Sequence, residues 1–150
     1  MSTMAEWQLD NAPDLKKEFP RSPAAEIGGY VLLARIVDKC LAVLAETEGE
    51  YKYNCGLDQR FFEFTGIDAE ELKQYIATGA SDEEVGKWCR ERDKKNSDDD
   101  ILVWGYLQRN REPEDPESIA HFEKLRREVA PRYPYIRTWA QLLDAEEGRL

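Results

Sequence analysis

The stretch from Tyr30 to Glu46 decides the fold, and it reads YVLLARIVDKCLAVLAE. Its apolar side chains recur at helical spacings, while its charged side chains gather on one stripe. The stripe consists of Arg35, Asp38, Lys39 and Glu46. This pattern predicts a central apolar helix over about residues 30–46. We expect the stripe to face solvent and to hold i,i+3 and i,i+4 pairs, with a binding surface as the alternative.

Six further helices are expected after the central one. Short acceptor side chains followed three positions later by an acid predict helix starts at Asp68 and Ser81, and Asp115-Pro116 predicts another. The expected buried stripes include Ile101, Trp104 and Leu107 in the helix from Ser97. In the helix from Pro116 they are Ile119, Phe122, Leu125 and Val129. The expected ranges are about 57–65, 69–78, 82–93, from Ser97 onward, 116–129 and 135–145.

The residues before the central helix are expected to form an arm, residues 1–21, that packs on the domain. Prolines and scattered apolar residues indicate short turns there, with Trp7, Leu15 and Phe19 as anchors. Ser22-Pro23 has the form of an N-cap followed by a first helical residue, which predicts a short helical turn.

The Gly28-Gly29 pair ends that turn and is expected to permit a bend or a close approach of a helix. No sequence pattern in the chain predicts a β-hairpin. The fold class is therefore all-α, with residues 22–150 forming a single compact multi-helix domain around the central helix.

Composition excludes several function classes. With 41% hydrophobic residues in 150, the chain can bury a core of its own. A formal net charge of -10 repels phosphate backbones and anionic lipid headgroups, so nucleic acid and membrane surfaces are disfavoured partners. Three cysteines without CxxC spacing, together with the lack of a signal-peptide pattern, predict a cytoplasmic protein.

Catalytic and metal-binding residues are scarce. Cys55 lies near a predicted helix start, where a thiol can become nucleophilic, but the chain has one histidine, His121, on a distant predicted helix. The alternative is that Cys55 is a small buried apolar residue. We expect no metal and no cofactor, since the acidic runs are explained as helix caps.

The stretch from residue 51 to 60 is the best candidate for a site, because it combines aromatic rings with hydrogen-bonding side chains beside a turn. Together with the polar stripe of the central helix, the candidate residues are Tyr51, Tyr53, Asn54, Cys55, Asp58, Gln59, Arg60, Arg35, Asp38 and Lys39. The alternative is purely structural: Asp58 caps a helix, Arg60 pairs with Asp58 or Glu63, and the rings belong to the core.

Three functions remain open, and whether the protein is an enzyme is undecided, with a non-enzyme favoured. The first hypothesis is a helical domain that binds a protein partner or a second copy of itself through the 51–60 turn and the polar stripe. The second is a small-molecule binder or enzyme with a pocket at that turn. The weakest is RNA binding through the basic run at residues 124–137.

Several segments resemble an uncharacterised bacterial family catalogued as domain of unknown function 5069. They are DLKKEFPRSP at 14–23, Gly28-Gly29-Tyr30, RIVDK at 35–39, YNCGLDQRFF at 53–62 and IRTWAQLLD at 136–144. The resemblance covers about residues 14 to 144 and implies a small stand-alone bacterial protein. It implies no activity, cofactor or catalytic residue.

Overall fold

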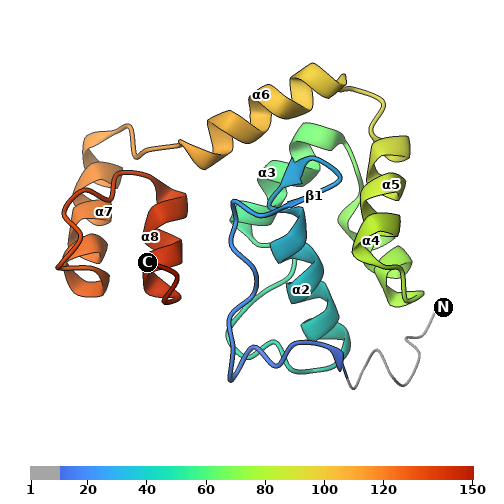
Figure 1. The fold of residues 1–150 in the computed structure, drawn as a ribbon, viewed down its shortest axis with the longest axis horizontal. Helices are drawn as coiled ribbons and strands as arrows, with labels where there is room; N and C mark the ends of the chain where they lie inside the picture. The colour runs from blue at the N-terminus through green and yellow to red at the C-terminus, as the bar shows by residue number, and fades with distance from the viewer. Residues whose placement is uncertain (1–10) are drawn as a thin grey trace.

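The structure is a computed structural model that describes residues 11–150. In this part of the chain the fold is predominantly helical, with seven helices and one two-stranded sheet, which confirms the predicted class (Figure 1). The elements are β1 (Glu26–Ile27), β2 (Tyr30–Val31), α2 (Leu33–Leu44), α3 (Gly56–Thr65), α4 (Ala69–Ala77), α5 (Asp82–Arg92), α6 (Asp98–Arg109), α7 (Pro116–Val129) and α8 (Trp139–Glu146).

Helix α2 lies at the centre, as predicted, but it begins three residues later than expected. Tyr30 and Val31 pair with β1 instead of joining the helix, and Leu32 precedes α2 with a left-handed φ of 72°. Burial extends over most of the helix surface, because the hairpin, α3 and α4 all pack against it. The consequence for its polar stripe is described below.

The absence of a hairpin is a wrong prediction. Ile27 pairs with Tyr30 across Gly28 and Gly29, whose φ angles of 60° and 88° suit glycine. A Cβ atom on Gly28 would lie 2.8 Å from the Cα of Gly86 in α5, so the glycines provide both the bend and the close helix approach that were expected. Alternation over two residues per strand is too short to be recognised in a sequence.

The N-terminal segment departs from prediction in two places. Ser22 begins a hydrogen-bonded turn, with the Ala25 N–H donating to its carbonyl at 3.0 Å, rather than a helix. Leu15 is buried, as expected of an anchor, whereas Phe19 is 55% exposed. The predicted anchor Trp7 lies outside the described residues, as does much of the predicted arm.

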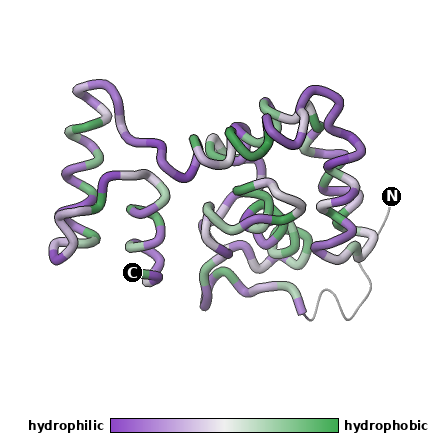
Figure 2. The backbone as a smooth tube through the Cα atoms, turned by 45° about the horizontal axis from the view of Figure 1, so that its top comes forward, coloured by the Kyte–Doolittle hydropathy of each residue, from purple (hydrophilic) through white to green (hydrophobic). Residues whose placement is uncertain are grey.

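The main core gathers side chains from α2 to α6 and from the hairpin. Tyr30 and Phe61 are fully buried at its centre, with ring centroids 5.4 Å apart in an edge-to-face arrangement. A second, smaller cluster joins α7 to α8 and is centred on Phe122, Ile136 and Leu142. Apolar segments accordingly concentrate in the middle of the larger part of the molecule, while α7 and α8 lie side by side at one end (Figures 1 and 2).

The predicted helix starts are confirmed where capping residues define them. Asp68, Ser81 and Asp115 each accept the expected backbone N–H at the N-cap. The last helix begins at Trp139 rather than near 135, because Thr138 and Gln141 form a capping box there.

Helices α6 and α7 bury less than their patterns predicted. Leu107 of α6 is 56% exposed and Ile119 of α7 is 44% exposed, so both are wrong as core predictions. On α6 the predicted residues Ile101 and Trp104 do face inward, together with Gly105. Each helix touches the rest of the protein along a narrow side only, which a repeating apolar pattern does not reveal.

Candidate functional site

The prediction that the charged stripe of α2 faces solvent is wrong for Arg35 and Lys39, whereas Glu46, which follows α2, is exposed as expected. Arg35 and Lys39 are 4% and 2% exposed, one helical turn apart on the same side of α2. Asp38 is half-buried and accepts three hydrogen bonds from Arg21, of 2.8 to 3.0 Å. Because a buried charge without a partner is very costly, each of these residues must be paired, and each partner comes from a distant element.

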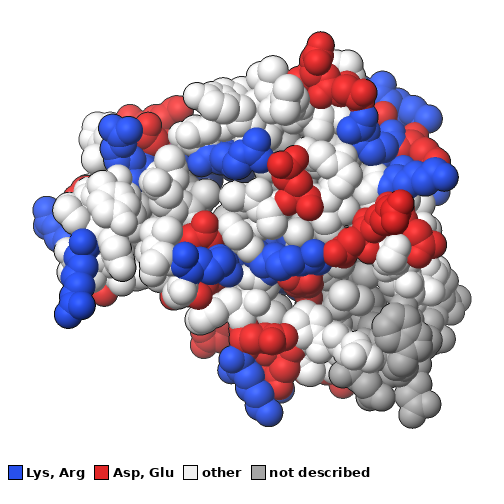
Figure 3. All heavy atoms as spheres, in the orientation of Figure 1, with Lys and Arg blue, Asp and Glu red and all other residues white. Residues whose placement is uncertain are grey.

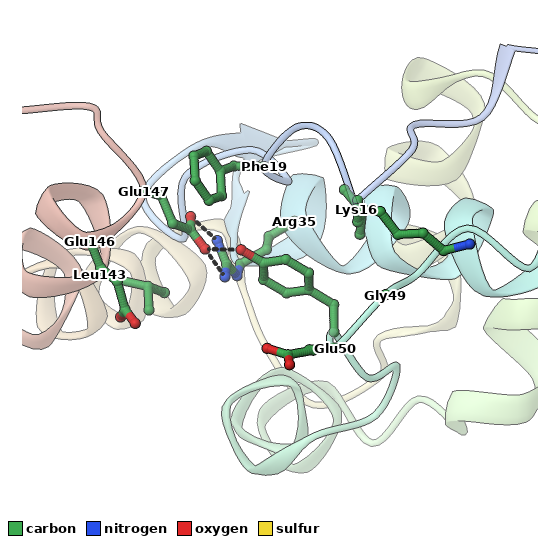
Figure 4. Close-up of a pocket in the computed structure, with 10 residues that line it drawn as sticks. Lys16, Phe19, Arg35, Gly49, Glu50, Leu143, Glu146 and Glu147 are labelled. Carbon is green, nitrogen blue, oxygen red and sulfur yellow. Dashed lines mark hydrogen bonds and ion pairs between the residues drawn. The ribbon is translucent and has the colours of Figure 1, made fainter.

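Arg35 forms a bidentate ion pair with Glu147, which follows α8. Its two terminal nitrogens donate to the two carboxylate oxygens at 2.8 and 2.7 Å. The Tyr51 hydroxyl donates to the same carboxylate at 2.8 Å, and Arg149 also pairs with it. The guanidinium of Arg35 lies 5.6 Å from the centre of the Tyr51 ring. This network connects α2, the 49–51 loop and the segment after α8. Figure 4 shows the pair between Arg35 and Glu147.

Titration of this network follows from its burial and its charges. Burial raises the pKa of Glu147, but the hydrogen bonds and charge of Arg35, with the bonds from Tyr51 and Arg149, outweigh it and lower the pKa below its ordinary value. Burial, followed by the hydrogen bond to Glu147, raises the pKa of Tyr51 to about 12. At neutral pH the network therefore holds a carboxylate and a neutral phenol.

Lys39 forms the second buried ion pair, one turn along α2. Its Nζ donates to Asp58 at 2.7 Å and lies 3.2 Å from the Cys55 sulfur. Asp58 also accepts the Asn54 N–H at 2.9 Å, beside the start of α3. Asp58 is therefore both the helix-end acid that was predicted and the counter-ion of a residue expected to be solvated.

A cavity of about 700 Å³ lies over the Arg35–Glu147 pair. Its volume is within the range of small-molecule sites, and apolar side chains share its lining with a few polar ones. Figure 4 shows Glu50 and Glu146 reaching it from the 49–51 loop and from the end of α8. The lining residues are Leu15, Lys16, Phe19, Arg35, Gly49, Glu50, Tyr51, Leu143, Glu146 and Glu147.

The remaining candidates do not join this cavity. The Tyr53 hydroxyl donates to the Ala69 carbonyl at 2.6 Å, and its ring packs on Phe62, as the structural alternative proposed. Asn54 is exposed in a left-handed turn with φ of 60°, and Gln59 donates to its carbonyl at 3.4 Å.

Arg60 pairs with neither of its predicted partners among the described residues. It lies instead in a separate surface hollow with Arg111, Glu112 and Glu114. Burial, followed by the charge of Arg60, lowers the pKa of Arg111. The 51–60 turn is thus divided among a cavity, an ion pair, the core and this hollow.

Sequence reasoning missed Glu147 and Arg149. The available signal was indirect: two cations beside an apolar helix face require carboxylates, but the sequence offers 31 acidic residues and no means of choosing among them. Proximity to the chain end made Glu147 an unremarkable surface acid, whereas it is 6% exposed.

The geometry offers little for covalent or metal chemistry. His121 is exposed on α7, whereas Cys55 is the N-cap residue of α3. Figure 1 shows α7 at one end of the molecule, away from α3. Burial raises the pKa of the Cys40 and Cys89 thiols to about 12. Between residues 11 and 150, no group of three or more His, Cys, Asp or Glu side chains is placed so that it could hold a metal ion. In the same part of the chain, none of the helices is both long and apolar enough to cross a membrane.

Comparison with curated proteins gave no match. A family described as Domain of unknown function (DUF5069) matches residues 17–149. The matched range includes α2, the 51–60 turn and all the residues that line the Arg35–Glu147 cavity except Leu15 and Lys16. Because the match covers most of the 150 residues, the chain belongs to the DUF5069 family.

Proposed function

We propose that this protein is a non-enzymatic binding protein whose small ligand occupies the cavity over Arg35, Tyr51 and Glu147. The observation that carries the proposal is a 700 Å³ cavity with partly apolar walls and an ionic floor whose charges are already paired. Such a floor is held in one geometry by its own hydrogen bonds, so it can orient a ligand without rearranging.

The ligand is expected to carry a positive charge next to an apolar group. Glu50 and Glu146 line the cavity, and their carboxylates have no ion pair with the described residues. Lys16 is the opposing charge, but its ammonium points away from the ion-paired floor in Figure 4. The net charge of -10 further favours cations, and the exposed Phe19 ring offers an apolar and cation–π contact.

Calorimetric titration with three probes of similar shape tests this proposal: phenethylamine, 2-phenylethanol and 3-phenylpropionate. We expect the amine to bind most tightly and the carboxylate least. A Glu50→Gln/Glu146→Gln variant should weaken amine binding at least about tenfold, because contacts to charged groups are lost.

Glu112→Gln/Glu114→Gln is the matched control, since it removes the same charge at the separate hollow lined by those residues. It should leave amine binding unchanged. Equal binding of amine and carboxylate, or no binding of any probe, would contradict the proposal.

The other predicted functions gain less support. Association through the polar stripe of α2 is disfavoured, since Arg35 and Lys39 are buried. RNA binding through residues 124–137 is disfavoured because the net charge of -10 repels a phosphate backbone. We further propose a cytoplasmic location, supported by three free cysteines.

A further inference from the structure

A second cavity, of about 200 Å³, lies where α8 meets the larger part of the molecule. It is separate from the cavity over Arg35 and Glu147, and Leu143 of α8 lines both. An apolar cavity of about 150 Å³ can hold benzene, so this one has room for a single ring with a small polar group. We call it the Trp139 cavity, and its apolar lining residues are Pro23, Leu32, Leu57, Trp139, Ala140 and Leu143.

The charged residues that line the Trp139 cavity are both arginines. Arg109 pairs with Glu26 at 3.3 Å, whereas the side chain of Arg111 has neither an ion pair nor a hydrogen bond within residues 11–150. No acidic residue of the same range lines the cavity. At the end of α6 that lies nearest to α7 and α8 in Figure 1, Figure 3 shows basic side chains at the surface. The cavity therefore combines apolar walls with an unpaired positive charge.

Arg111 is held beside the Trp139 wall of the cavity. Its guanidinium carbon lies 5.7 Å from the centre of the Trp139 ring, and its carbonyl accepts the Trp139 N–H at 3.0 Å. Burial and the charge of Arg60 lower the pKa of Arg111, against the opposite effect of Glu114. A half-buried guanidinium beside a second cation is stabilised by an anion that it can bind in a bidentate pair.

Gln108 offers a second polar group to the same cavity. Its side-chain amide also has no hydrogen bond within the described residues, and an amide nitrogen can donate to an anion. Glu112 and Glu114, the acids nearest to Arg111 in sequence, line the separate hollow beside Arg60 and not this cavity. Two donors thus adjoin apolar walls, which is the usual composition of a small-molecule site.

We propose that the Trp139 cavity binds a compact apolar carboxylate, of which an aromatic acid is the simplest example. The apolar group of the ligand lies against the leucine side chains and the Trp139 ring, where its burial is favourable. The carboxylate accepts hydrogen bonds from the Arg111 guanidinium and the Gln108 amide. This ligand has the opposite charge to the one proposed for the Arg35–Glu147 cavity, and the site does not depend on that proposal.

Calorimetric titration with benzoate, and with benzamide as its uncharged counterpart, tests the site. The wild type should bind benzoate more tightly than benzamide. Arg111→Gln should weaken benzoate binding about tenfold or more, because a charged contact is lost, and it should leave benzamide binding nearly unchanged. Ala140→Leu should weaken the binding of both probes, since the larger side chain fills the cavity. Circular dichroism checks that both variants keep the helical fold.

Arg127→Gln is the matched control, because Arg127 is an exposed arginine of α7 that lines neither cavity. It removes the same charge and should leave benzoate binding unchanged. A wild type that does not bind benzoate, or an Arg127→Gln effect equal to that of Arg111→Gln, would overturn the proposal. Unchanged benzoate binding in Ala140→Leu would overturn it as well, since the anion would then occupy the hollow beside Arg60.

The two cavities can be tested independently of each other. Arg111→Gln should leave phenethylamine binding unchanged, and Glu50→Gln/Glu146→Gln should not weaken benzoate binding. 3-Phenylpropionate should bind the Trp139 cavity more weakly than benzoate, because its longer chain separates the carboxylate from the ring and Arg111 adjoins the apolar wall. Comparing amine and carboxylate probes in Arg111→Gln removes any contribution of this site. Failure of benzoate to bind would therefore overturn this inference alone.

Discussion

Helices α2 and α6 have the same length, 12 residues, but they differ in which side chains are exposed to water. Helix α2 buries an arginine and a lysine, while α6 exposes two leucines, a valine and a tyrosine. The difference follows from position: α2 is surrounded by other elements, and α6 covers the protein with one side only (Figure 1). The place of a helix in the fold thus decides which of its residues meet water.

The two helices also differ in what their unusual residues require. Buried Arg35 and Lys39 need counter-ions, and removing one partner leaves an uncompensated charge in the interior. The exposed apolar side chains of α6, which are Leu102, Val103, Tyr106 and Leu107, need no partner in the rest of the chain, so their substitution should leave the fold intact. Stability measurements can therefore separate the two helices.

The largest effect is expected for Lys39→Met. It leaves Asp58, which is 1% exposed, without its counter-ion, so the free energy of unfolding should fall by roughly 3–5 kcal/mol in urea denaturation. A Lys39→Met/Asp58→Leu variant should recover part of this loss, because no isolated charge remains. If Asp58→Leu lowered the stability of the Lys39→Met variant by as much as it lowers that of the wild type, the two residues would not be coupled.

An intermediate, pH-dependent effect is expected for Glu147→Gln. The amide keeps some hydrogen bonds to Arg35 but loses the charge, so about 1–3 kcal/mol of stability should be lost at pH 7. The pKa of Glu147 is lowered by folding, so its contribution is present above the unfolded pKa, about 4.3, and is lost as pH falls through the folded value.

Urea denaturation between pH 3 and 7 measures this dependence. Wild-type stability should fall more steeply than that of Glu147→Gln below about pH 4.3, so the two curves converge in acid. Glu112→Gln, at an exposed glutamate, is the control and should follow the wild type. Parallel curves for Glu147→Gln and wild type would contradict a lowered pKa in the folded protein.

The sequence predicted the helices well because local rules define them. The acceptor at Ser81 and the acid at Glu84 form their capping box in the structure, and α2 lies at the centre as its apolar pattern indicated. The hairpin at 26–31 was missed, since two residues per strand carry no periodic signal.

The candidate site was predicted only in part, because pairing over long distances has no local signature. Tyr51 and Arg35 do meet at the cavity, but the Glu147 that joins them is 112 residues from Arg35 in sequence. Charge alone indicated that the α2 stripe should be solvated, and only the tertiary structure reveals its counter-ions. For the same reason the pattern of α6 could not show that Leu107 lies on an uncovered side.

The smallest effect is expected for Leu107→Ala. The Leu107 side chain is already 56% exposed, and alanine favours helix, so the free energy of unfolding should change by less than about 0.5 kcal/mol. Leu33→Ala, the same truncation at a fully buried position of α2, should cost about 2–5 kcal/mol. Urea denaturation of both variants at one low concentration compares them directly. An equal loss in the two would mean that the outer side of α6 is packed within the monomer, and the contrast between the helices would fail.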